Sequence, residues 1–210
     1  MAKNSSTRSV GKACFGNWLV TAALLFGSTA SSVQGAESTD ITRNCNECHG
    51  TDGLGFKPGV PHLNGQPDYL LTNMINAFQQ GKRSTKVKMH RDITDAEVAP
   101  LARHYAQKKA QRPKSATNPD LVARGEAVYL KRCADCHVDN GRDSDKEAPL
   151  MAAQDLNYLI DQTLAFKTGV RKFPFLMDGA YKDLADEDLT AAAHFFAAQE
   201  QEVPKKRRRR

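Results

Sequence analysis

Apolar residues recur along the chain at the three- and four-residue spacing of helices, and no stretch alternates with the two-residue period of a strand. Between residues 68 and 80, four apolar side chains fall on one helical face, and a similar segment covers residues 156–168. Another helix is expected after Asn118, because Pro119 suits the first helical position. The pattern predicts an all-α fold.

The stretch from Thr94 to Glu97 predicts a further helix start. Its Thr-Asp-Ala-Glu sequence forms a capping box, in which threonine and glutamate satisfy each other's backbone N–H groups. Val98, Leu101 and Tyr105 then form an apolar face. Pro100 falls near the second turn and is expected to kink or strain this helix.

The chain contains an internal repeat. Adding 88 to the residue number places one five-residue run, Cys45 to His49, on a second run, Cys133 to His137. The same offset aligns more identical residues without a gap: Gly53 with Gly141, Pro61 with Pro149, Gln66 with Gln154, Ala77 with Ala165, Phe78 with Phe166, Gly81 with Gly169, Arg83 with Arg171 and Met89 with Met177. After the methionines the offset becomes 91, because the second copy has three extra residues within residues 178–183. We therefore expect a duplicated domain.

The repeated run has the Cys-x-x-Cys-His form that attaches a c-type haem. The two thiols would form thioethers to the haem vinyl groups, and the histidine would bind the iron. The predicted residues are Cys45, Cys48 and His49 in the first copy and Cys133, Cys136 and His137 in the second. The motifs predict two covalently bound haem c groups.

Zinc and disulfides are the alternatives for these cysteines. Zinc-ribbon pairs usually lie about 15–20 residues apart, whereas Cys48 and Cys133 are 85 positions apart. Disulfides would suit an oxidising compartment, but they give no reason for a histidine directly after each pair. The two histidines favour haem.

The repeat also selects a candidate sixth ligand for each iron. Beyond the first segment the chain has four methionines: Met74, Met89, Met151 and Met177. Only Met89 and Met177 are equivalent, and each follows its motif histidine by 40 residues. A single methionine more often fills a gap in a core, as we expect for Met74 and Met151. The duplicated pair favours Met89 and Met177 as iron ligands.

Two histidines are alternative ligands. His90 is next to Met89, and His62 lies in the first loop. Neither is repeated, because the equivalent positions hold Asp178 and Leu150.

The N-terminus resembles a secretory signal peptide. Three basic residues precede an apolar run over residues 13–26, and a Ser/Thr/Gly-rich segment follows, with cleavage expected after Gly35 or Ala36. A membrane anchor is the alternative, but about 20 apolar residues are needed to span a bilayer, and this run is shorter and interrupted by Asn17. We expect export to the periplasm. Cleavage would also remove Cys14, leaving only the motif cysteines.

The positive charge belongs to the ends of the chain. The whole chain has 30 Lys and Arg against 24 Asp and Glu. Three of the basic residues lie in the predicted signal and six in the run from Lys205 to Arg210, which leaves 21 basic residues for the rest. The domains therefore give no support for nucleic-acid binding. The basic tail is either solvated or a site for transient contact with an acidic partner or an anionic membrane surface.

The composition places the boundaries between segments. We expect a signal peptide over residues 1–36, a first domain over 37–108, a polar linker over 109–118, a second domain over 119–203 and a basic tail over 204–210.

This arrangement resembles the class I c-type cytochromes, and its duplication resembles the dihaem c-four-type cytochromes and the cytochrome subunit of flavocytochrome c sulfide dehydrogenase. The matching first-half segments are residues 45–53, 63–66, 78–83 and 94–97, and the second half matches over residues 136–141 and 166–171. The resemblance covers nearly all of residues 40–200.

The resemblance implies the surroundings of each haem. The carbonyls of Pro61 and Pro149 would accept hydrogen bonds from His49 and His137, which orients the rings. A glycine of the first helix would pack against an aromatic residue of the last, here Gly125 with Phe195 or Phe196. The first-half equivalent of Gly125 is Glu37, so we expect a short opening helix there, with a more exposed haem edge.

Iron with ligands on both faces has no open position for a substrate, so one-electron transfer is the expected chemistry. We predict a periplasmic electron carrier with no catalytic residue. Its redox partner would be a flavoprotein sulfide dehydrogenase, with this chain as the haem subunit, or a terminal oxidase, with this chain as a free shuttle. A dihaem enzyme of the peroxidase or thiosulfate dehydrogenase type is the alternative, and it would need Met177 displaced by the adjacent insertion.

Overall fold

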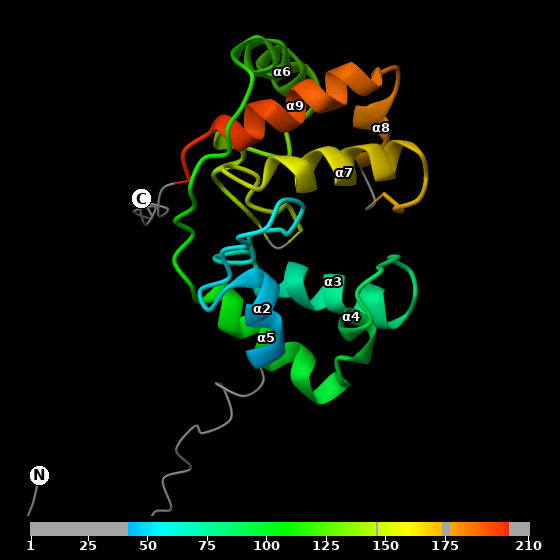
Figure 1. Cartoon of the computed structure of the whole chain (residues 1–210). Coiled ribbons are helices and arrows are strands. Elements are labelled where there is room, and N and C mark those ends of the chain that lie inside the picture. The colour runs from blue at the N-terminus through cyan, green and yellow to red at the C-terminus, as the bar shows by residue number, and fades with distance from the viewer. Residues whose placement is uncertain (1–41, 146, 174–176, 202–210) are drawn as a thin grey trace, which may run out of the picture. The chain divides into compact units, whose positions relative to one another are not determined.

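The computed structural model describes residues 42–145, 147–173 and 177–201 (Figure 1). The predicted signal peptide, residues 37–41, residues 202–203 and the basic tail lie outside this part of the chain.

The described residues are helical and form no β-strand, only an isolated antiparallel bridge between Arg112 and Gln201. In chain order the helices are α2 (Arg43–His49), α3 (Asp68–Gln79), α4 (Met89–Asp92), α5 (Asp95–Ala106), α6 (Pro119–Arg132), the 3₁₀ helix η1 (Asp139–Gly141), α7 (Leu156–Lys167), α8 (Met177–Tyr181) and α9 (Asp186–Ala198). This confirms the predicted all-α class. In the ranges that the structure covers, every helix is too short or too polar to cross a membrane.

The duplication in the sequence is also present in the structure. Gly53 and Gly141 have positive φ angles of 76° and 77°. A Cβ atom at these glycines would approach the rings of Tyr105 and Phe196 to 2.8 and 2.9 Å, respectively. Only glycine combines this backbone conformation with so close a contact. Each motif loop therefore packs against the last helix of its own half in the same way.

The first half is built on the contact between α3 and α5. Leu71 from α3 packs against Leu101, Ala102 and Tyr105 from α5. The carboxylate of Glu97 accepts hydrogen bonds from the backbone N–H and the hydroxyl of Thr94, at 2.8 and 2.7 Å. The capping box is therefore confirmed.

Pro100 lies inside α5, and the helix continues past it to Ala106. A proline near the second turn removes a backbone donor whose acceptor is close to the helix start, so the loss is smaller there than in a helix interior.

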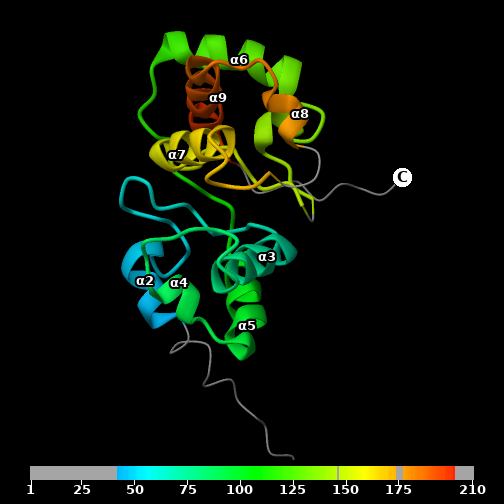
Figure 2. The same cartoon turned by 90° about the vertical axis from the view of Figure 1, so that its right-hand side faces the viewer.

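The second half is built around the crossing of α6 and α9 (Figures 1 and 2). The side chain of Asn118 accepts hydrogen bonds from the N–H groups of Asp120 and Leu121 at 2.9 and 3.4 Å, which confirms the predicted start of α6. At Gly125 a Cβ atom would lie 2.0 Å from the carbonyl oxygen of Ala191 and 2.9 Å from Phe195 Cβ. The predicted glycine–aromatic contact therefore involves Phe195, and it also brings the two backbones together.

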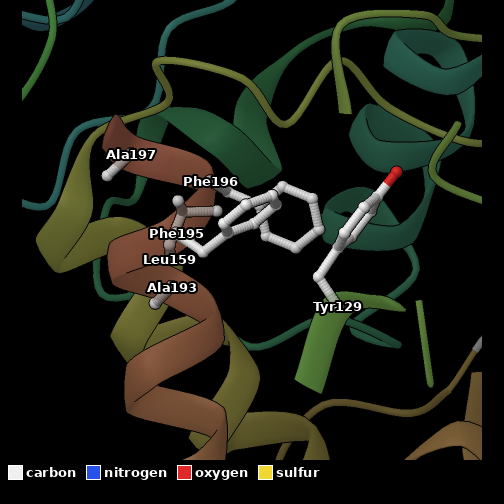
Figure 3. Packing of buried hydrophobic residues seen from close by; sticks show 6 residues of the cluster. All are labelled: Tyr129, Leu159, Ala193, Phe195, Phe196 and Ala197. Atoms are coloured by element: carbon white, nitrogen blue, oxygen red, sulfur yellow. The ribbon is translucent and has the colours of Figure 1, made fainter. Parts of the chain in front are cut away.

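The core of the second half lies beside this crossing. Figure 3 shows the ring of Tyr129 directed toward Phe195 and Phe196, with its hydroxyl pointing away from the cluster. Tyr129 stacks on Phe195 at a centroid distance of 4.7 Å and meets Phe196 edge-on at 5.6 Å. Leu159 from α7 belongs to the same cluster. The three helices thus share one aromatic core.

The predicted linker is packed against both halves. Arg112 is buried, and its guanidinium donates to the backbone and side-chain oxygens of Asn64 at 2.8 and 3.1 Å and to the carbonyl of Leu150 at 3.1 Å. Burial lowers the pKa of Arg112 to about 9. The sequence predicted only that this segment connects the two halves. The structure shows in addition that its Arg112 is buried and bonded to both of them.

Two equivalent glutamines join the halves. Gln66 donates to the carbonyl of Leu150 at 2.9 Å and accepts from its N–H at 3.0 Å. Gln154 donates to the carbonyl of His62 at 2.9 Å and accepts from its N–H at 2.6 Å. His62 and Leu150 are equivalent under the offset of 88, so the contact has approximate two-fold symmetry.

We predict that Gly125→Ala destabilises the protein by about 2–3 kcal/mol or more, because the added methyl group forces α6 and α9 apart. Chemical unfolding of the haem-loaded protein, followed by far-UV circular dichroism, measures this. Gly179→Ala is the matched control, since a Cβ atom there has no neighbour within 4 Å. Equal stability of the two variants would contradict the close crossing.

We also predict that Gln154→Leu costs about 2 kcal/mol or more, because it leaves the buried N–H and carbonyl of His62 without partners. Gln66→Leu should have a similar effect through Leu150. Gln111→Leu, at an exposed side chain, should change the free energy of unfolding by less than about 0.5 kcal/mol. A Gln154→Leu protein as stable as this control would refute the role of the glutamine bridge.

Candidate haem-binding site

The first motif lies on α2 and is partly buried. Cys45 packs against the α3–α5 core, and burial raises the pKa of its thiol. His49 Nδ1 lies 3.0 Å from the carbonyl oxygen of Pro61. Burial lowers the pKa of His49, and this hydrogen bond partly offsets the effect. The expected contact of Pro61 is confirmed, and a neutral His49 with Nδ1 donating keeps Nε2 available for a metal.

The second motif follows the C-terminus of α6. Cys133 packs against the aromatic core, and burial, together with Cys136, raises the pKa of its thiol to about 11. The backbone is fixed by Tyr129, whose hydroxyl donates to the carbonyl of His137 at 2.9 Å. The His137 ring meets Phe196 edge-on at 6.0 Å. This motif is thus positioned by the core of its own half.

The expected hydrogen bond between His137 and Pro149 is wrong for this structure. His137 Nδ1 is buried and has no hydrogen-bond partner among the described residues. The loop before Pro149 instead turns on Asp145, whose carboxylate accepts from the N–H groups of Glu147 and Ala148 at 2.8 and 2.7 Å. The first-half equivalent of Asp145 is Lys57, whose side chain cannot accept these bonds. There the backbone carbonyl of Lys57 accepts a hydrogen bond from the N–H of Val60 at 3.0 Å instead.

The two candidate methionine ligands each begin a short helix. Met89 is the first residue of α4, is 36% exposed and lines a cavity of about 420 Å³ together with Cys45, Ile93 and Leu101. Met177 is the first residue of α8 and is partly buried, and residues 174–176 before it lie outside the described part. The structure therefore brings Met89 and Cys45 to one cavity.

The other two methionines have structural surroundings. Met151 packs against the aromatic core of the second half, as expected. The sulfur of Met74 instead accepts hydrogen bonds from Arg83 at 3.2 Å and from Arg171 at 3.4 Å. Met74 thus lies between the halves and not only in the core of the first.

Arg83 and Arg171 form a cluster. The repeat showed that the two arginines are equivalent but gave no role for them. Both donate to Gln162, at 2.9 Å from Arg83 and 2.8 Å from Arg171, and Arg83 also donates to Tyr158 at 3.0 Å. Burial lowers the pKa of Arg171 to about 10. Burial alone would raise the pKa of Tyr158, but the charges and hydrogen bonds of the two arginines outweigh it and lower that pKa.

Neither arginine has an ion-pair partner in the part of the chain that the structure describes. Two partly buried guanidiniums without an ion-pair partner among the described residues fit a ligand that brings its own negative charge. The haem group carries two carboxylates, so the surroundings match the cofactor that the motifs require.

The described residues contain no cluster that suits zinc. Across residues 42–145, 147–173 and 177–201, no three His, Cys, Asp or Glu side chains come together as a metal site. In the same ranges the four motif cysteines form no disulfide.

No protein-family model matches the chain. Among curated proteins, it is similar to cytochrome c4 of Thiocapsa roseopersicina, with 28% identity over 166 residues that cover 72% of this chain and 84% of that protein. It is also similar to a thiosulfate dehydrogenase electron acceptor of Thiomonas intermedia, with 28% identity over 170 residues that cover 74% and 78% of the two chains.

A shorter relative is more similar over a single half. Cytochrome c-554(548) of Halomonas halodenitrificans is 32% identical over 79 residues, which cover 35% of this chain and 95% of that protein. Among solved structures, reduced cytochrome c4 from Pseudomonas stutzeri matches with a TM-score of 0.66 at 22% identity, covering 78% of this chain and 97% of that one.

The motifs, the duplicated helical halves and these relatives agree on the family and on the chemistry. The chain belongs to the c-type cytochromes and is a dihaem electron-transfer protein of the cytochrome c4 type, with two covalently bound haem c groups.

Proposed function

We propose that this chain is a periplasmic electron carrier that accepts single electrons from a redox enzyme and passes them from one haem to the other. The observation that carries the proposal is the first site, where Pro61 holds the ring of His49, while Cys45 and Met89 line one cavity. Each haem, when bound, supplies the one-electron redox change. An electron carrier needs these residues to exclude water and hold the ligands in place, not to bind a substrate.

The residues of the chain would divide the work as follows. The motif cysteines attach the haems, and His49 and His137 bind iron from one side. The repeat favours Met89 and Met177 as the second protein ligand of the first and second iron, and His90 would be the alternative for the first. Arg83 and Arg171 would pair with haem carboxylates, because each has buried donors and no acidic partner in the described residues.

Two relatives carry the name thiosulfate dehydrogenase electron acceptor, one from Thiomonas intermedia and one from Stutzerimonas stutzeri. They support a sulfur-compound dehydrogenase as the electron donor to this chain. A flavoprotein sulfide dehydrogenase as donor and a terminal oxidase as acceptor stay predictions from the sequence.

The surface beside Met89 suits an acidic redox protein. Lys82, Lys86, Lys88 and Arg91 are exposed there, and of these only Lys88 pairs with an acidic side chain in the described residues, Asp92 at 3.7 Å. Val87 is exposed between them. An apolar centre with a charged rim is typical of transient interfaces.

The second half differs at the same place. The equivalents of Lys82, Lys86 and Lys88 are Val170, Pro174 and Leu176. We therefore place the acidic partner on the first half. The basic tail from Lys205 to Arg210 lies outside the described residues and would add steering toward the same kind of partner.

We predict that the triple variant Lys82→Gln, Lys86→Gln, Lys88→Gln slows oxidation of the reduced protein by hexacyanoferrate(III) by about three- to tenfold at low ionic strength, because an anion loses its local attraction. Stopped-flow absorbance measures the rate. The control triple Lys131→Gln, Lys172→Gln, Lys182→Gln removes the same charge from exposed positions of the second half. Equal slowing in both would show that only net charge matters.

We predict that Met177→Ala removes the methionine–ferric iron absorption band of the second haem and makes that haem reactive toward added cyanide, since the sixth position opens. Absorption spectra before and after cyanide addition test this, with Met151→Leu as the control that changes a core methionine. A band unchanged in Met177→Ala would reject Met177 as a ligand.

A further inference from the structure

The ring of His90 lies near the ring of His49. Their centroids are 6.2 Å apart, and their planes differ by 35°. Imidazole nitrogens bind transition metals at about 2 Å. Two rings on opposite sides of one metal therefore have centroids about 6 Å apart, which is the separation found here.

Each ring is held through the nitrogen that a metal would not use. His49 Nδ1 lies 3.0 Å from the carbonyl of Pro61, and His90 Nδ1 lies 3.1 Å from the hydroxyl of Thr85. Ligating histidines usually have their second nitrogen fixed by such a partner. The Nε2 atom of each ring is then the one available to iron.

The ring of His90 is also positioned by an aromatic neighbour. It stacks on Phe78 at a centroid distance of 4.8 Å and an angle of 28°. This contact, together with the hydrogen bond to Thr85, fixes the ring from two sides.

The second half has no counterpart of this histidine. With the offset of 91 that applies after the methionines, His90 matches Tyr181. Tyr181 meets the equivalent phenylalanine, Phe166, only edge-on at a centroid distance of 6.2 Å, whereas Phe173 stacks on Phe166 at 5.2 Å. The offset of 88 gives Asp178, which is exposed. A second imidazole beside the motif histidine is thus a property of the first half.

We propose that His90 Nε2, and not the sulfur of Met89, is the sixth iron ligand of the first haem in the ferric protein. This rests on the proposed function, because it requires a haem attached at Cys45 and Cys48 and bound by His49. Imidazole lowers the reduction potential of haem iron relative to thioether. The first haem is then the lower-potential one, and electrons move from it to the second.

The test uses the ferric holoprotein and single variants. The wild type should show one methionine–iron band per two haems, together with a low-spin electron paramagnetic resonance signal of bis-imidazole iron. Met89→Ala should leave both signals unchanged. His90→Ala should abolish the bis-imidazole signal, while Asp178→Ala, at the exposed position after Met177, should leave it intact.

A wild-type protein with two methionine–iron bands, of which Met89→Ala removes half and His90→Ala none, would overturn the assignment of His90. The haem content, measured as the pyridine haemochrome, separates this result from failure of the proposed function. Fewer than two haems per wild-type chain would contradict the proposed function itself, whatever the ligand of the first iron.

Discussion

Each half of this protein has to complete a core that its own side chains fill only in part. In the first half the buried apolar cluster consists of Leu71, Leu101, Ala102 and Tyr105, with a few partly buried neighbours around it. So small a domain buries a smaller fraction of its surface than a large one does, and its stability on that basis alone is marginal. A haem attached at the motif cysteines would add a large apolar body for the helices to pack against. The positions of Cys45 and Cys133, each packed against the core of its half, follow from this requirement.

The glutamine and arginine contacts between the halves are symmetric, whereas the buried Arg112 and the ligand loops have no matching counterpart in the other half. The two glutamine bridges and the paired arginines are equivalent under one offset, and each side chain bonds to the opposite half or to a side chain shared by both. A change at one of these positions leaves a buried group unsatisfied on the other half. The ligand loops have no such constraint, and there the two copies differ in charge, in length and in the residue that covers the α3 or α7 phenylalanine.

The sequence predicted those features that depend on neighbouring residues. The helix expected over residues 68–80 ends one residue earlier, and the Thr94 capping box and the Asn118 cap form as expected. The close packing at Gly125 was predicted from the resemblance. A glycine that lets two helices cross closely can be recognised at a single position of the sequence. The role of Arg112 was not predictable, because its partners Asn64 and Leu150 are 48 and 38 residues away and belong to different halves.

The hydrogen bond expected between His137 and the carbonyl of Pro149 is the opposite case to Arg112. Here the sequence predicted a contact that the structure does not contain. The prolines match in the two copies, but the path of the chain before them depends on whether position 57 or 145 can accept backbone hydrogen bonds. The side chain of aspartate accepts them and that of lysine cannot, and only His49 has its Nδ1 within hydrogen-bond distance of the equivalent proline carbonyl. A histidine with a fixed Nδ1 proton is a stronger and better oriented ligand than one without. The surroundings of the two motif histidines therefore differ, and so do the sequences of the two ligand loops. The duplication thus preserves one helical module in both halves, while the loops beside the two motifs have diverged.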